Sequence, residues 1–178
     1  MPARVTKPAF NLRDKLTQLD GTVPYEKMPP GSIWLLNHTT SATRTNVSSN
    51  STWTSLAGLS IDVTQRTIGS TLWVEHNFTM ELHSGINGLH FKVIRESPVG
   101  FVPTQVYFHS QHSHWSTSLP QWSGPGTIYL TFMDEPNVPL GQKIRYYVQC
   151  YKEQGNNLYS NYGQDESGIQ NLVWEIKQ

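Results

Sequence analysis

Three histidines close together in the chain, His109, His112 and His114, come nearest to the types and spacing of a metal site. Alternate residues of a strand share a face, so His112 and His114 would present their imidazoles to the same side and could share a metal ion. A zinc site needs a third or fourth ligand, and no cysteine or glutamate is evidently paired with them. We therefore expect hydrogen bonds in a solvated loop or between subunits, with a metal site as the alternative reading, and we predict no cofactor.

His76 is a separate candidate, because it interrupts the apolar side of segment 71–81, TLWVEHNFTME. A hydrogen-bonded core histidine, or one at a subunit axis, is the expected role in preference to a ligand. Since an unperturbed histidine has a pKa of about 6.5, this residue is also a candidate acid-sensitive position.

The sequence contains little that indicates catalysis. It contains no Gly-x-Ser-x-Gly elbow, no Walker loop and no His-Glu-x-x-His motif. Glu75 and Glu81 would be roughly 20 Å apart along one strand at about 3.3 Å per residue, too far for a glycosidase carboxylate pair. Asp134 and Glu135 are expected in a turn, pointing in different directions. We predict a protein that is not an enzyme.

Aromatic residues in polar, loop-like stretches suggest a binding surface. These residues are Trp115, Trp122, Tyr159 and Tyr162. Exposed aromatic rings flanked by Asn, Gln and His can hold a pyranose ring, but Trp and Tyr also carry much of the binding energy at protein interfaces. The interface is the favoured interpretation, and sugar binding is the alternative.

The elements that must position these residues are β-strands. Segment 71–81 alternates Leu72, Val74, Phe78 and Met80 against polar residues, the pattern of a half-buried strand that a second sheet must cover. Further strands are expected at 32–36, 53–59, 61–64, 89–94, 101–108, 127–133, 143–151 and 172–176. Gly85, Asn87 and Gly88 mark a turn, which predicts that 89–94 is the hairpin partner of the long strand. The polar run 37–51 is expected to be a surface loop or edge.

Eight or nine strands with turn signals about every ten residues predict an all-β antiparallel sandwich, with a jelly roll favoured and an immunoglobulin-like sandwich as the alternative. Residues 1–30 differ, because five prolines interrupt them. They predict an extended N-terminal arm with a short helix at 11–20, in which Leu12 and Leu16 lie on one stripe and dock on a partner or a sister subunit. Residues 31–178 are expected to form the jelly-roll β-sandwich domain.

Composition narrows the classes of partner. The 13 Lys and Arg balance the 13 Asp and Glu, so nucleic acid and anionic membranes are disfavoured. No stretch approaches the ~18 apolar residues of a membrane span, and the N-terminus lacks the apolar region of a signal peptide, so a soluble chain is expected. The single cysteine, Cys150, is expected to be a small buried hydrophobe.

The order of segments GSIWLL, STWTSLAGLSIDVT, IGSTLWVEHNFTMEL, GLHFKVIRE, IYLTFMDEPN, KIRYYVQCY and SGIQNLVWEI resembles small all-β structural proteins of tailed bacteriophages. The resemblance covers roughly residues 31–178. It implies a trimeric jelly roll similar in shape to tumour-necrosis-factor and C1q heads, used as a capsid decoration (cement) protein or as a piece of tail fibre. The implied location is the virion, assembled in the host cytoplasm.

The expected function is that of a homotrimeric cement protein that clamps neighbouring capsid subunits and binds the major capsid protein or another virion structural protein. Tyr147, Gln149 and Tyr151, with Trp73 and His76, are the candidates for the three-fold face or its rim. In the alternative, a receptor-binding module, Trp115, Trp122 and the histidine cluster hold a host-surface glycan.

Overall fold

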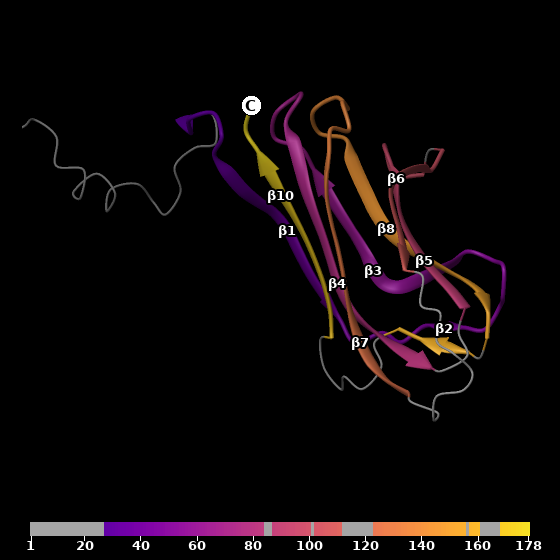
Figure 1. Ribbon diagram of the computed structural model, residues 1–178. Helices are drawn as coiled ribbons and strands as arrows, with labels where there is room; N and C mark the ends of the chain where they lie inside the picture. Colours follow the sequence, from indigo (N-terminus) through magenta and orange to yellow (C-terminus); the bar gives the residue numbers. More distant parts are fainter. Residues whose placement is uncertain (1–26, 84–86, 101, 112–122, 156, 161–167) are drawn as a thin grey trace, which may run out of the picture.

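The computed structural model of the protein describes residues 27–83, 87–100, 102–111, 123–155, 157–160 and 168–178. The strands in these residues are β1 (Ile33–Ser41), β2 (Asn46–Val47), β3 (Thr54–Thr64), β4 (Thr71–His83), β5 (Asn87–Glu96), β6 (Thr104–Gln111), β7 (Ser123–Asp134), β8 (Lys143–Gln154), β9 (Leu158–Tyr159) and β10 (Ile169–Ile176). They form two four-stranded sheets, in the orders β1-β10-β4-β7 and β3-β8-β5-β6, and a small β2-β9 pair (Figure 1).

The strand pairs are nested along the chain. β5 pairs with β6, β4 with β7, β3 with β8 and β1 with β10, all antiparallel. Pairing of β10 with β4 and of β8 with β5 completes the two sheets. A long hairpin rolled up in this way is the jelly roll, so the predicted fold class is confirmed and the immunoglobulin-like alternative is excluded.

The core lies between the two large sheets and follows the alternation of the sequence. On β4, Leu72, Val74, Phe78 and Met80 are fully buried. They face the buried side chains of the opposite sheet, which on β8 are Ile144, Tyr146, Val148 and Cys150. Burial of each large apolar side chain contributes about 1.5–3 kcal/mol, and this burial holds the sheets together.

Cys150 occupies the predicted place of a small core hydrophobe. Its thiol is buried, and burial raises its pKa to about 12. The thiol therefore stays protonated at neutral pH, as expected of a structural core cysteine, since the nucleophile of a cysteine is its thiolate.

The predicted hairpin between the long strand and 89–94 is wrong. β4 pairs with β10 and β7, whereas β5 pairs with β6 and β8 in the opposite sheet. The two strands cover the same core from opposite sides, so Phe78 of β4 meets Phe91 of β5 edge-to-face with ring centroids 5.5 Å apart. Local turn residues show that the chain reverses, but not whether it stays in one sheet.

The polar run 37–51 is partly strand. β1 continues through it to Ser41 and pairs with β10 alone, as an edge strand. The expected edge is therefore confirmed for its first part. The predicted helix at 11–20 lies outside the described residues, and no α-helix occurs in the described part of the chain.

A polar clamp joins the two sheets at one end of the core. Arg95 of β5 donates from Nη1 to both carboxylate oxygens of Asp134, at the end of β7, at 2.7 Å each. The hydroxyl of Tyr146 on β8 donates to the same carboxylate at 2.7 Å. Burial, together with the negative charge of Asp134, raises the pKa of Tyr146 above its usual value. The carboxylate is mostly buried, so each of these donors compensates part of its lost hydration.

We predict that Tyr146→Phe lowers the free energy of unfolding by about 1.5–3 kcal/mol, because Asp134 loses a hydrogen bond to a charged group without a change in core volume. Urea unfolding measures this change. Tyr129→Phe is the matched control, because Tyr129 is 67% exposed, and it should change stability by less than about 0.5 kcal/mol. Equal stability of the two variants would contradict a structural role for the clamp.

Candidate functional site

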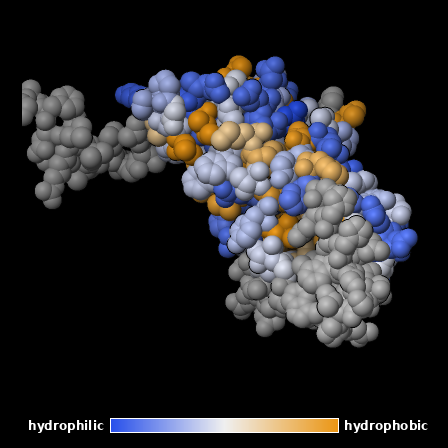
Figure 2. Space-filling view, in the orientation of Figure 1, coloured by the Kyte–Doolittle hydropathy of each residue, from blue (hydrophilic) through white to orange (hydrophobic). Residues whose placement is uncertain are grey.

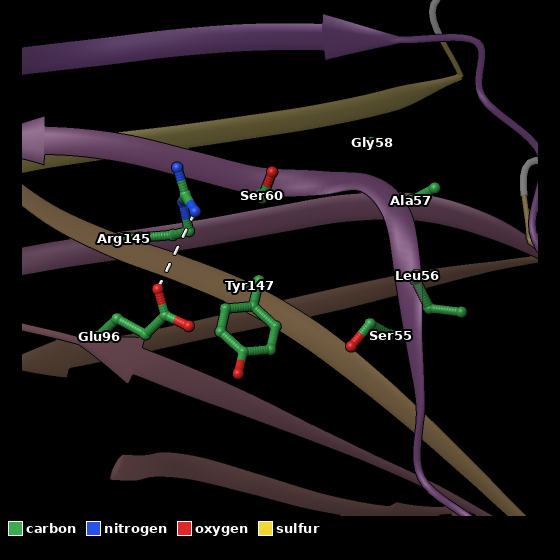
Figure 3. Close-up of a pocket in the computed structure, with 8 residues that line it drawn as sticks. All are labelled: Ser55, Leu56, Ala57, Gly58, Ser60, Glu96, Arg145 and Tyr147. Carbon is green, nitrogen blue, oxygen red and sulfur yellow. Dashed lines mark ion pairs between the residues drawn. The ribbon is translucent and has the colours of Figure 1, made fainter. Parts of the chain in front are cut away.

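A pocket of about 350 Å³ opens on the outer face of the β3-β8-β5-β6 sheet. It is lined by Ser55, Leu56, Ala57, Gly58, Ser60, Glu96, Arg145 and Tyr147. Figure 3 shows Arg145, Glu96 and Tyr147 of the neighbouring strands on one side and the bend of β3 on the other.

The bend is a β-bulge at Gly58. The register of β3 on β8 shifts between Ser55 and Ser60, so the intervening residues leave the ladder. Gly58 has φ +79°, and a Cβ at this position would lie 2.5 Å from Oγ of Ser41. Only glycine fits both the left-handed backbone and the close approach of β1. The pocket therefore follows from a single glycine within a strand.

The charges at the pocket are paired. Arg145 binds the Asp62 carboxylate through Nε at 2.7 Å and Nη2 at 3.1 Å, and its Nη1 lies 4.0 Å from Glu96. Lys143 adds a longer contact to Asp62, at 3.7 Å. The hydrogen bond from Arg145 holds the pKa of Asp62 below its usual value, while burial and the Glu96 charge raise the pKa of Tyr147. At neutral pH the pocket therefore carries balanced charge and a neutral phenol.

Farther along the same face, side chains of Trp53, His90, Phe108 and Tyr151 form what we call the aromatic cluster. The Trp53 ring lies 5.2 Å from Tyr151 and 6.3 Å from Phe108, between centroids. His90 stacks on Phe108 at 5.9 Å with an interplanar angle of 20°. Lys92 places its ammonium nitrogen 4.2 Å from the centroid of Trp53, a cation–π contact. Four chain segments therefore contribute rings to one surface.

The opposite sheet presents different chemistry on its outer face. Leu35 pairs with Trp174, Trp174 with Trp73 and Trp73 with Met133, so one large apolar side chain from each strand stands in a continuous line. We call these four residues the apolar row. Its two ends are exposed, Leu35 to 38% and Met133 to 66%. Figure 2 shows hydrophobic side chains at the surface in the region of β1, β10 and β4.

The structure separates the residues that the sequence suggested for a three-fold face. Tyr147, Gln149 and Tyr151 lie on the outer face of β8, between the pocket and the aromatic cluster. Trp73 lies on the outer face of the other sheet, in the apolar row. His76 is buried in the core and cannot belong to a surface, because its place on β4 is on the inner side. The prediction that these residues share one three-fold face is therefore wrong: the exposed ones lie on the outer faces of two different sheets.

Several other sequence candidates lie outside the described residues. They are His112, His114, Trp115, Trp122, Tyr162, Leu12 and Leu16. Tyr159 is described and lies on β9, where the guanidinium of Arg44 stands 4.1 Å from its ring centroid. Asp134 is the last residue of β7 and not part of a turn, so the expected turn is wrong there. The two side chains do diverge as expected, because Asp134 belongs to the clamp and Glu135 accepts a hydrogen bond from Thr71 at 3.3 Å. In the described part of the chain no three His, Cys, Asp or Glu side chains gather to hold a metal ion.

Sequence reasoning missed the aromatic cluster and the apolar row. Both are assembled by strand register: Phe108 lies opposite Lys92, and His90 opposite Tyr151. The outward alternation of His90 on β5 and of Tyr151 on β8 was visible in the sequence. Their proximity was not, because it requires the pairing of β5 with β8.

His76 is the hydrogen-bonded core histidine that the sequence predicted. Its Nδ1 lies 2.7 Å from Oδ1 of Asn171, while the amide nitrogen of Asn171 donates to Thr39 and to the carbonyl of Gly58. Since that nitrogen is engaged, Oδ1 must accept, and Nδ1 of His76 carries the proton. Its Nε2 is buried without a hydrogen-bond partner. Burial lowers the pKa of His76 to about 4, so the ring is neutral at physiological pH.

No known protein family and no curated protein matches the chain. Among solved structures, it is similar to the infectious bursal disease virus VP2 subviral particle, with 14% identity and a TM-score of 0.34, over 83% of this chain and 38% of that one. The Gx strain structure of that virus gives 14% identity, a TM-score of 0.33 and coverage of 83% and 37%. The structure of the Gt strain shares 15% identity with the chain and has a TM-score of 0.32, and the match covers 82% of this chain and 37% of that one. The chain thus spans well under half the length of these neighbours. No helix in its described residues could cross a membrane.

We predict that stability falls as the pH is lowered from about 6.5 towards 4. In this window the unfolded chain protonates His76, with a pKa near 6.5, but the folded chain does not, because its pKa is about 4. The loss attributable to this residue is about 3 kcal/mol by pH 4.

The measurement is urea unfolding of wild type and His76→Gln at pH 7 and pH 4. Glutamine retains a donor for Asn171 but does not titrate, so the variant should lose less stability over this interval, by about 3 kcal/mol. The difference in stability between the two proteins at pH 7 gives the effect of the substitution itself. Parallel losses in the two proteins would show that His76 is not the acid-sensitive group.

Proposed function

We propose that the chain is a non-enzymatic structural protein of a virion, a homotrimeric capsid decoration or cement protein of a tailed bacteriophage. The observation that carries the proposal is the apolar row, which crosses all four strands of the β1-β10-β4-β7 sheet on the side away from the core. We assign protein association to this surface because Trp and Met are enriched at the cores of protein interfaces.

The dimensions of this surface suit the core of an interface. Across the sheet, four strands about 4.8 Å apart span roughly 14 Å. Along β10, at about 3.3 Å per residue, the outward residues extend the apolar area over roughly 13 Å. These residues are Leu172, Trp174 and Ile176, each partly exposed. Polar neighbours on the same face, such as Glu75 and Thr131, form a rim. An apolar centre with a polar rim is the usual organisation of a specific interface.

The phage assignment draws on the sequence resemblance over residues 31–178, and it agrees with the jelly-roll fold. In this proposal the apolar row makes the contact between subunits, and the N-terminal arm attaches each trimer to the major capsid protein or another shell protein. The last residues of the arm and the first of the domain are tied to the C-terminal end of the chain: Lys177 Nζ donates to the carbonyl of Met28 at 2.6 Å, and the Gly31 amide donates to the carbonyl of Lys177 at 2.7 Å. Removal of residues 1–26 therefore leaves these ties in place.

We predict that Met133→Glu converts the trimer into monomers, because it places a charge at one end of the apolar row, within the proposed desolvated interface. Native mass spectrometry and analytical ultracentrifugation measure the mass. Val102→Glu is the matched control, since Val102 is also an exposed apolar residue, at 83%, but lies outside the apolar row. A monomeric wild type, or a mass unchanged by Met133→Glu, would contradict the proposed contact.

Binding to purified expanded shells of the virus tests the decoration role. The full-length trimer is expected to bind, and the protein that lacks residues 1–26 is expected to remain trimeric but to lose binding. If the full-length trimer does not bind the shells, the decoration role is wrong even if the protein is a trimer.

A further inference from the structure

We propose that the outer face of the β3-β8-β5-β6 sheet binds a neutral oligosaccharide that lies along β8, with one sugar ring against the aromatic cluster and another in the pocket at Gly58. This binding site goes beyond the proposed structural role, and it uses the sheet that carries no part of the apolar row.

The aromatic cluster offers the apolar half of such a site. Phe108 is 49% exposed although one side of its ring stacks on His90, so it presents apolar surface to solvent. Trp53 and Tyr151 are partly exposed beside it. Sugar rings bear C–H groups on their faces, which pack on aromatic rings, while the hydroxyls at their edges remain free for hydrogen bonds.

The pocket offers the polar half. Hydroxyl groups of Ser55, Ser60 and Tyr147, the Glu96 carboxylate and the Arg145 guanidinium lie around one concavity (Figure 3). This mixture of donors and acceptors matches the paired donor and acceptor capacity of sugar hydroxyls. Its volume of about 350 Å³ is at the lower end of small-molecule sites, which fits a single sugar ring better than a large ligand.

The charge balance favours a neutral ligand. Arg145, the cation nearest the pocket, already shares two hydrogen bonds with Asp62 and lies beside Glu96. An anionic ligand would have to displace these carboxylates or approach them, and either step costs electrostatic energy. A phosphate or a sialylated glycan is therefore disfavoured, and a polyhydroxylated neutral ligand is not.

The spacing of the two halves sets the size of the ligand. Tyr147 at the pocket and Tyr151 in the cluster are four residues apart on β8, about 13 Å at 3.3 Å per residue, which exceeds the width of one sugar ring. Gln149 lies between them, and its amide donates to Ser55 at 3.1 Å. Lys92 lies opposite Gln149 on β5. The middle of the site therefore has polar side chains, as an oligosaccharide that lies along the strand requires.

The test is binding of the full-length protein to a printed array of neutral oligosaccharides, followed by isothermal titration with the best of them. Sialyllactose and a heparin tetrasaccharide serve as anionic probes. We expect at least one neutral oligosaccharide to bind in the micromolar to millimolar range. Phe108→Ala and Tyr147→Ala should each weaken it at least tenfold, because they remove opposite ends of the site.

Tyr129→Ala is the matched control, since Tyr129 is an exposed aromatic residue on the other sheet, and its affinity should equal that of wild type. Urea midpoints of all variants verify that they fold, and native mass spectrometry verifies their oligomeric state. The proposal is overturned if no neutral oligosaccharide binds, if only anionic probes bind, or if both site variants bind as wild type does. It is also overturned if Phe108→Ala dissociates the oligomer, because the face is then a protein interface. The effect of Met133→Glu is measured separately, so the two proposals can fail independently.

Discussion

The hydrogen bonds of the Asn171 side-chain amide connect β10 to three other strands, and both the pocket and the core histidine depend on them. From β10 the amide accepts a hydrogen bond from His76 of β4 at 2.7 Å, and it donates to Thr39 of β1 at 3.0 Å and to the carbonyl of Gly58 on β3 at 2.9 Å. A buried amide without partners would cost several kcal/mol, so these three groups must keep their places for the fold to be stable. The contact to Gly58 crosses from one sheet to the other. It therefore fixes the bulge that shapes the pocket and, through the same amide, the tautomer of His76 with the proton on Nδ1. The neutral state of His76 follows from its burial.

The regular strands were largely predictable from sequence, because period-two alternation decides which residues share a face. On β4, β7 and β8 the apolar residues of the pattern, from Leu72 to Cys150, are the buried ones. On β10 the same reasoning gives the strand but not the buried face. Asn171 and Glu175 are buried there, while the bulkier Leu172 and Trp174 face outward.

The reversed face of β10 has a polar cause that no local pattern reveals. The buried Glu175 carboxylate accepts hydrogen bonds from the backbone of Arg66 and Thr67 at 3.0 Å and from the Ser70 hydroxyl at 2.5 Å. It thus accepts the hydrogen bonds of donors in a turn that lies more than one hundred residues away in the sequence. Partners of this kind, like the rings that gather around Trp53, become neighbours only through strand pairing, and pairing is a long-range property. Hydropathy alone would assign the outward Trp174 to the core.

The different chemistry of the two outer faces follows from the sandwich architecture. In a sandwich each sheet commits one face to the core, so the two outer faces can carry unrelated chemistry. Here one face carries the apolar row and the other carries the pocket and the aromatic cluster. If subunits associate through the first, the second stays accessible in every copy, and an oligomer displays several identical sites together. Open, shallow sugar sites bind weakly because little ligand surface is buried in each. Linked copies overcome this weakness, since after one site has bound, the others meet the same glycan surface at high effective concentration. Assembly through one sheet is therefore the condition under which weak recognition by the other could hold a particle to a surface.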